Sequence, residues 1–150
     1  MAAEMPVRRS VVVESRPSAL EQSCREILSA LEAGGFSQDD IFAVHLALEE
    51  AFLNAVKHGN RMDPTKKVTI EYTVDREKVE ICMTDEGPGF DPASIPDPRV
   101  GKNLYRPEGR GLLLIRSYMH TVEYSERGNS LRMVRRKGQP VPQHGQATAT

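Results

Sequence analysis

Four polar side chains in the middle of the chain have the types and spacing to do chemistry. At about 100° per helical residue, Glu50, Asn54, Lys57 and His58 fall on one face of a predicted helix. Oxygen ligands such as those of Glu50 and Asn54 suit Mg²⁺, which takes few protein ligands together with phosphate and water. A solvated helix face would have the same spacing, so both interpretations stay open at this point. The presence of Asn, a mediocre helix former, favours a specific role for Asn54.

A second candidate is the segment Asp85-Glu86-Gly87-Pro88-Gly89-Phe90, which directly follows an apolar strand pattern. An aspartate at the end of a strand, followed by two glycines, places a carboxylate beside backbone that a ligand can approach closely. The same Asp-x-Gly pattern also occurs in ordinary turns, so the segment alone does not identify a site.

The third candidate is Gly109-Arg110-Gly111, which we expect to open a helix. The free N–H groups and the dipole at such a start favour an anion, and glycine permits close approach of a phosphate. Lys102 and Arg106 lie nearby in the sequence. Many helices begin after a glycine, so this signal is weak when taken alone.

Other chemistries find little support. The sequence has no GxxxxGK[ST] phosphate loop and no GxGxxG, because position 92 is proline. The two cysteines lack CxxC spacing, which argues against a structural zinc and a disulfide scaffold. A net charge of -1 gives no general attraction to nucleic acid or to anionic membranes. The apolar runs are far shorter than the roughly 20 residues of a membrane helix. We therefore expect a cytoplasmic protein of 150 residues with one domain.

The elements that must position these residues follow from periodicity. We expect strands at 7–14, 68–74, 79–83, 121–126 and 130–136, and helices from Ser18 to before Gly34, from Ser37 to about His58, and over 111–120. Ser18 with Glu21, and Ser37 with Asp40, have the spacing of a capping box. This order predicts the α+β class, a two-layer sandwich with helices on one face of a mixed, mostly antiparallel sheet.

Two segments depart from regular structure. Glycine and proline crowd the stretch from 85 to 111, and a loop this long usually signals function or disorder. Residues 138–150 are rich in Gln, Pro, Thr and Ala, and we expect them to form a disordered tail behind a domain spanning 1–137.

Together, in order and spacing, residues 50–59, 85–90 and 109–115 resemble the N, G1 and G2 boxes of one ATPase superfamily. It contains gyrase, heat-shock 90 chaperones, histidine kinases and MutL-type repair proteins. Within it, the chain most resembles the anti-sigma-factor serine/threonine protein kinases of bacterial partner-switching systems. The resemblance implies the Bergerat ATP-binding fold, a long ATP lid over 91–108, and ATP or ADP with Mg²⁺ as ligands.

For the N box, the resemblance implies that Glu50 is the general base and that Asn54 binds Mg²⁺, with Lys57 and His58 near the nucleotide. Histidine kinases usually carry Asn where Glu50 stands, and this difference favours the serine/threonine kinases.

For the G1 box, the resemblance implies that Asp85 accepts a hydrogen bond from the adenine amino group. Gly87, Gly89 and Phe90 would lie against the base. Asn129 matches a position near adenine that is often held by Thr.

For the G2 box, the resemblance implies that Gly109, Gly111 and Leu112 bring backbone N–H groups to the phosphates. Arg106 or Arg110 would offset charge on the transferring phosphoryl group.

The resemblance further implies a substrate and partners. The substrate would be an anti-sigma-factor antagonist, a small STAS-type domain with one acceptor Ser or Thr. A sigma factor would be a second partner, and the protein would be a homodimer that binds neither nucleic acid nor membrane. His120 stands where an acid commonly follows the Met that ends the G2 helix. Two alternatives stay open, an ATP-gated binding module without phosphotransfer and the ATPase part of a split histidine kinase.

Overall fold

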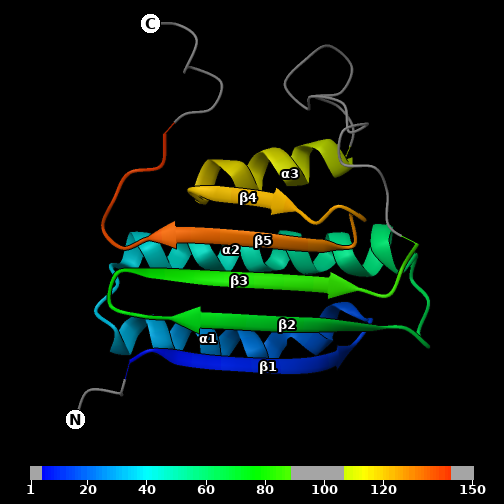
Figure 1. Cartoon of the computed structure of the whole chain (residues 1–150), viewed down its shortest axis with the longest axis horizontal. Coiled ribbons are helices and arrows are strands. Elements are labelled where there is room, and N and C mark those ends of the chain that lie inside the picture. The colour runs from blue at the N-terminus through cyan, green and yellow to red at the C-terminus, as the bar shows by residue number, and fades with distance from the viewer. Residues whose placement is uncertain (1–4, 89–106, 143–150) are drawn as a thin grey trace, which may run out of the picture.

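The computed structural model describes residues 5–88 and 107–142. Figure 1 shows the order of the elements along the chain. They are β1 (Val7–Glu14), a 3₁₀ turn (Pro17–Leu20), α1 (Glu21–Ala33), α2 (Gln38–Asn54), a π-helical turn (Ala55–Gly59), β2 (Lys67–Val74), β3 (Lys78–Asp85), α3 (Pro107–Tyr118), β4 (Thr121–Tyr124) and β5 (Ser130–Arg136).

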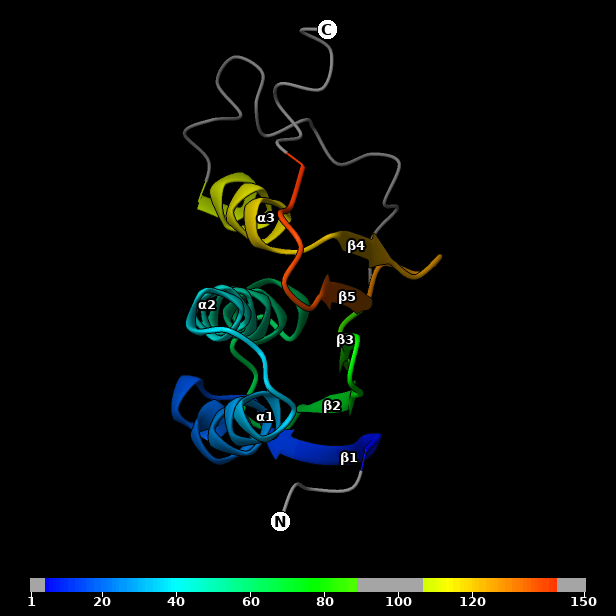
Figure 2. The same ribbon diagram turned by 90° about the vertical axis from the view of Figure 1, so that its left-hand side faces the viewer.

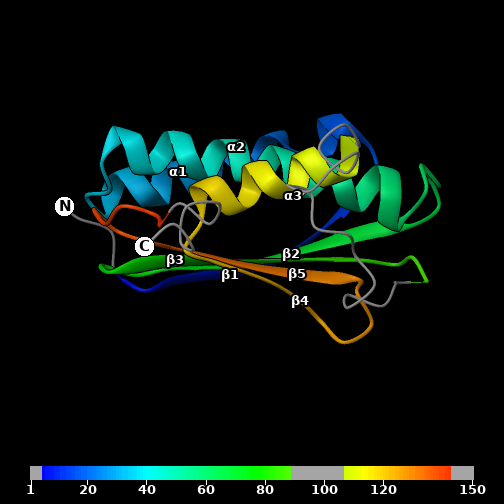
Figure 3. The same cartoon turned by 90° about the horizontal axis from the view of Figure 1, so that it is seen from above.

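The strands form one sheet in the order β1-β2-β3-β5-β4, and every pairing in the described part of the chain is antiparallel. The helices α1, α2 and α3 lie on the same face of this sheet (Figure 2). The view along the layers shows one layer of helices over one layer of strands (Figure 3). The predicted α+β two-layer sandwich is confirmed, whereas the described sheet is antiparallel throughout and not mixed as predicted. No helix among the described residues is long and apolar enough to cross a membrane.

The core lies between the two layers. Alternate residues of the central strands point into it, because successive side chains of a strand face opposite sides of the sheet. On β2 and β3 these buried residues are Val68, Ile70, Tyr72, Val74, Val79, Ile81 and Met83. On the helices they include Ile27, Leu31, Val44, Leu48, Phe52 and Ile115. Each fully buried aliphatic or aromatic side chain contributes roughly 1.5–3 kcal/mol to folding, so this layer holds the sandwich together.

The two predicted capping boxes have different outcomes. The box at the start of α2 is confirmed: the Ser37 hydroxyl accepts from the Asp40 N–H at 3.1 Å, and the Asp40 carboxylate accepts from the Ser37 N–H at 3.3 Å. The box at Ser18 is wrong. Residues Pro17–Leu20 form a 3₁₀ turn, α1 begins only at Glu21, and its N-cap Leu20 offers no side-chain bond.

The α3 helix also differs from its predicted bounds. It begins at Pro107, before the glycines, because proline at the first helical position loses no hydrogen bond and has the φ that a helix needs. It ends at Tyr118, because the N–H of His120 donates to the carbonyl of Val134 on β5 at 2.8 Å. Of the predicted lid, 91–106 lies outside the described residues, and positions 107 and 108 belong to α3.

Candidate functional site

Glu50 and Asn54 lie one turn apart on the last turns of α2, and both are half-buried. Among the side chains that the structure describes, which are those of 5–88 and 113–142, neither has a hydrogen-bond or ion-pair partner, so both can engage a ligand. Lys57 and His58 follow in the π-helical turn and are exposed. The wider π turn changes the angular spacing of Lys57 and His58 from that of the α-helical residues before them. The structure therefore gives Glu50 and Asn54 a more protected setting than Lys57 and His58.

The end of this helix packs directly on the end of β3. A Cβ atom added to Gly59 would lie 2.1 Å from Oδ2 and 2.3 Å from Cγ of Asp85. A Cβ atom added to Gly87 would lie 1.9 Å from the carbonyl oxygen of Gly59. All three distances are far shorter than any real contact of a Cβ atom, so only glycine fits at either position without a shift of its neighbours. The predicted N-box and G1-box segments thus meet at a glycine-to-glycine contact beside the Asp85 carboxylate.

The Asp85 carboxylate is held in place by the backbone of its own turn. Its Oδ1 accepts from the Gly87 N–H at 2.8 Å. Burial raises the pKa of Asp85, although the Gly87 hydrogen bond and the positive charge of Lys66 oppose that rise. A half-buried carboxyl whose orientation is set by the backbone can accept a hydrogen bond from a ligand amino group with good directionality.

Asn129, which is predicted to lie near adenine, contacts the backbone of Asp85. Its carbonyl accepts from the Asp85 N–H at 2.9 Å, and its side-chain Nδ2 donates to the Asp85 carbonyl at 3.4 Å. The Ser125 hydroxyl donates to the Asn129 Oδ1 at 3.3 Å. Asn129 therefore braces the end of β3 from the β4–β5 turn.

A residue that the sequence analysis did not single out, Asn60, organises the same corner. It is fully buried, and its Nδ2 donates to the Ser15 hydroxyl at 3.1 Å and to the Lys67 carbonyl at 3.0 Å. Its Oδ1 accepts from the Glu86 N–H at 2.8 Å, while the Glu86 carboxylate accepts from the Lys67 N–H. In the sequence, Asn60 marks only the end of a helix, and nothing local distinguishes it from any other asparagine there.

The α3 helix packs against α2 and runs antiparallel to it, so its first turn lies at the same end of the helix pair as Asn54 (Figure 1). Gly109 is in that first turn, where backbone N–H groups lack partners within the helix. Gly111 is two positions further in. Three other predicted positions, Gly89, Phe90 and Arg106, lie outside the described residues, and of Arg110 and Leu112 the structure describes only the helical backbone.

The donor set at this corner fits a magnesium ion held with a phosphate ligand. Half-buried Asn54 supplies an amide oxygen, a hard ligand of the kind that Mg²⁺ prefers, and the Glu50 carboxylate lies one turn before it. In the described part of the chain, no group of three or more His, Cys, Asp or Glu side chains could hold a metal ion. An ion here would therefore depend on phosphate oxygens and water for most of its coordination.

Comparison with known proteins relates this arrangement to one family. The family model of the histidine kinase-like ATPase domain matches residues 13–135. The serine-protein kinase RsbW of Bacillus licheniformis is 35% identical over 97 residues, which cover 59% of this chain and 59% of that protein. The RsbW of Listeria monocytogenes serotype 4a (strain HCC23) is 32% identical over 108 residues, 67% of this chain and 69% of that protein. The anti-sigma F factor of Oceanobacillus iheyensis is 29% identical over 106 residues, 66% of this chain and 71% of that protein.

One solved structure supports the same fold. The crystal structure of the RsbU and RsbW domains of Rv1364c from Mycobacterium tuberculosis matches with a TM-score of 0.59 and 14% identity. The match covers 89% of this chain and 34% of that one. At this identity the likeness is one of fold.

Proposed function

Because the chain belongs to the histidine kinase-like ATPase domain family, we propose that it is an ATP- and Mg²⁺-dependent serine/threonine protein kinase. Its substrate is an anti-sigma-factor antagonist, a small STAS-type domain with an acceptor Ser or Thr. The observation that carries the proposal is the contact of Gly59 with Asp85 and Gly87, which sets the C-terminal end of the helix that bears Glu50 and Asn54 against the Asp85 carboxylate. The names of the relatives, serine-protein kinase and anti-sigma factor, support both the reaction and the class of partner.

Each residue has a distinct task in the proposed reaction. The Asp85 carboxylate accepts a hydrogen bond from the adenine amino group, and Gly87 orients that carboxylate through its N–H while leaving room for the Gly59 carbonyl. Asn54 would hold the magnesium ion, which when bound would supply positive charge to offset that of the phosphates. The first turn of α3 supplies backbone N–H groups to the phosphates. Glu50 takes the proton from the attacking hydroxyl as the γ-phosphoryl group moves to that oxygen and ADP leaves.

The proposal extends to the partners. The same protein also binds a sigma factor, as the name of the Oceanobacillus relative suggests. The chain would then alternate between two partners, the sigma factor and the antagonist. Phosphorylation of the antagonist then removes the competitor that draws the kinase away from the sigma factor. A homodimer is the proposed assembly.

The experiment that tests the kinase is phosphate transfer from Mg-ATP to small antagonist domains encoded in the same genome, followed by intact-mass spectrometry. Wild type should add one acid-stable phosphate, and Glu50→Gln should add none while still binding ATP. Glu49→Gln is the matched control, because Glu49 is the exposed neighbour that pairs with His45 at 2.8 Å. Glu49→Gln should transfer normally.

Three outcomes would change the assignment. Normal transfer by Glu50→Gln would remove Glu50 as the base. Confirmed ATP binding without transfer to any antagonist would replace the kinase with an ATP-gated binding module. Acid-labile phosphate on a partner histidine would identify the ATPase part of a split histidine kinase.

A further inference from the structure

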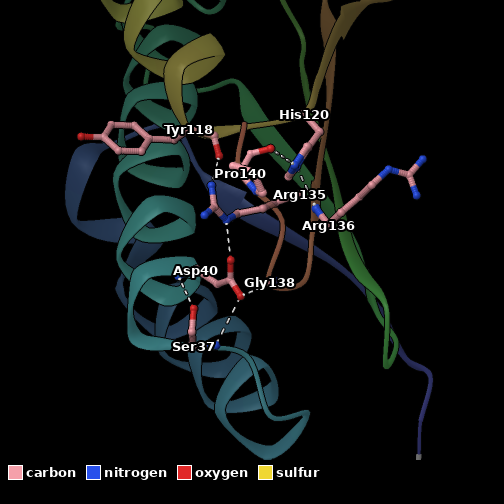
Figure 4. A network of polar contacts seen from close by, with 8 residues as sticks. All are labelled: Ser37, Asp40, Tyr118, His120, Arg135, Arg136, Gly138 and Pro140. Carbon is pink, nitrogen blue, oxygen red and sulfur yellow. Dashed lines mark hydrogen bonds and ion pairs between the residues drawn. The ribbon is translucent and has the colours of Figure 1, made fainter. Parts of the chain in front are cut away.

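A buried ion pair joins the two site-bearing helices at the end opposite to the site. Asp40 is 1% exposed and Arg135 is 8% exposed. The Arg135 Nε donates to the Asp40 Oδ1 at 2.9 Å, and its Nη1 donates to the carbonyl of Tyr118 at 2.6 Å (Figure 4). A single guanidinium on β5 therefore links the first turn of α2 to the last residue of α3.

The pair has the hydrogen bonds it needs to remain charged. The Asp40 Oδ2 accepts from the Gly138 N–H at 3.0 Å and from the Ser37 N–H at 3.3 Å. Burial alone would raise the pKa of Asp40, but the hydrogen bonds from Gly138, Arg135 and Ser37 outweigh it and lower that pKa. Among the described residues, no buried side-chain polar atom lacks a partner.

The two charges also match the ends of the helices that they touch. Asp40 lies in the first turn of α2, where the helix dipole favours an anion. Arg135 donates to the terminal carbonyl of α3, where the dipole favours a cation. The contact is therefore directional, and an apolar contact of equal area would not specify the same relative position of the helix ends.

Because of the length of the helices, a small change at this contact displaces the opposite helix ends, which carry the candidate site. Asp40 and Glu50 are ten residues apart on α2, about 15 Å at 1.5 Å per residue, and Gly109 is at a similar distance from Tyr118 on α3. A rotation of α3 by about 5° at one end would move the other end by more than 1 Å. Displacements of about 1 Å can cost about 100-fold in a reaction that depends on positioning.

We propose that Asp40 and Arg135 are positioning residues for the phosphate half of the nucleotide site, which fix the first turn of α3 relative to Glu50 and Asn54. This inference rests on the proposed function. The adenine half does not depend on the pair, because Asp85 is held by Gly87, Asn129 and the Asn60 corner. The α2 helix is itself anchored to the sheet through Gly59, so loss of the pair leaves α3 positioned only by less directional packing, such as that of the buried Ile115.

The test compares the binding of Mg-ATP with that of adenosine, which lacks phosphates, by calorimetry. Arg135→Met and Asp40→Asn should each weaken ATP binding by about tenfold or more, while adenosine binding changes by less than about twofold. Arg136→Met and Asp39→Asn are matched controls, because both side chains are exposed neighbours of the pair. Both controls should bind ATP as wild type does.

The double variant Asp40→Asn/Arg135→Met separates positioning from stability. Each single variant leaves one buried charge unpaired and should lower the melting temperature. The double variant leaves no unpaired buried charge, so its melting temperature should return most of the way to that of wild type. If the pair positions α3, the double variant keeps its weakened ATP binding despite the recovered stability. Recovery of ATP affinity with the melting temperature, or equal losses for ATP and adenosine, would overturn the inference. Failure of wild type to bind ATP would instead refute the proposed function on which it rests.

Discussion

Replacing Gly59 by alanine should selectively destroy recognition of the adenine amino group. The new Cβ would lie 2.1 Å from Oδ2 and 2.8 Å from Oδ1 of Asp85, so the carboxylate must retreat by more than 1 Å to reach an ordinary contact, which begins at 3.4 Å. The backbone of Gly59 cannot yield instead, because its carbonyl already lies against Gly87. The displaced carboxylate loses a hydrogen bond between a charged acceptor and the base, worth about 1.5–3 kcal/mol. ATP should therefore bind roughly 10- to 150-fold more weakly.

The assay is calorimetric titration with ATP and with inosine triphosphate, which has a carbonyl where adenine has the amino group. Wild type should prefer ATP, and Gly59→Ala should lose that preference with little change for inosine triphosphate. In an Asp85→Ala background the same substitution should add no further loss, because the affected acceptor is already gone. Asp85→Asn, which introduces no clash, provides a second variant if Gly59→Ala folds poorly.

Gly34→Ala is the matched control, because a Cβ there comes no closer than 3.1 Å, to the flexible end of Met5. It should leave the affinity for both nucleotides unchanged. Wild-type discrimination between ATP and inosine triphosphate in Gly59→Ala would refute the reasoning, and so would an equal loss for the two nucleotides.

Three other predictions follow from the described contacts. Asn54→Ala should remove the Mg²⁺ dependence of ATP binding, measured by titration with and without chelator; an unchanged dependence would place the ion elsewhere. Asn60→Ala removes the partners of the Glu86 N–H and the Lys67 carbonyl, so the free energy of unfolding measured in urea should fall by about 2–4 kcal/mol. A change near zero would show that these hydrogen bonds do not stabilise the corner. The His120 Nδ1 accepts from the Arg136 N–H and its Nε2 donates to the Pro140 carbonyl, so the folded ring is neutral. Burial and the nearby Arg135 and Arg136 lower the pKa of His120. The neutral ring therefore stabilises the folded protein fully above the ordinary pKa near 6.5, and this contribution is lost as the pH falls through the lowered pKa. Urea unfolding should show that the free energy of unfolding of the wild type falls between pH 7.5 and 5, and His120→Gln should lack this part of the fall. The same dependence of the free energy of unfolding on pH in the two proteins would contradict the prediction.

Several parts of the fold could be predicted because they depend on neighbours in the sequence. The period-2 alternation of β2 and β3 identified their buried faces, and the Ser37-to-Asp40 spacing identified the start of α2. The errors arose where two local signals competed. At Ser18, proline favoured a 3₁₀ turn over the capping box, and at the start of α3 the helix-starting preference of Pro107 outweighed the helix-breaking tendency of glycine.

The sequence by itself determined the chemistry available: a carboxylate and an amide one turn apart at Glu50 and Asn54, and an Asp-x-Gly at a strand end. Motif order then related these residues to one ATPase family. Only the tertiary structure decided that Gly59 packs on Asp85, that Asn60 ties Glu86 to Lys67, and that Asp40 meets Arg135, which is 95 residues away. Periodicity and capping reflect interactions over a few residues, whereas these contacts exist only because the packed layers bring distant segments together.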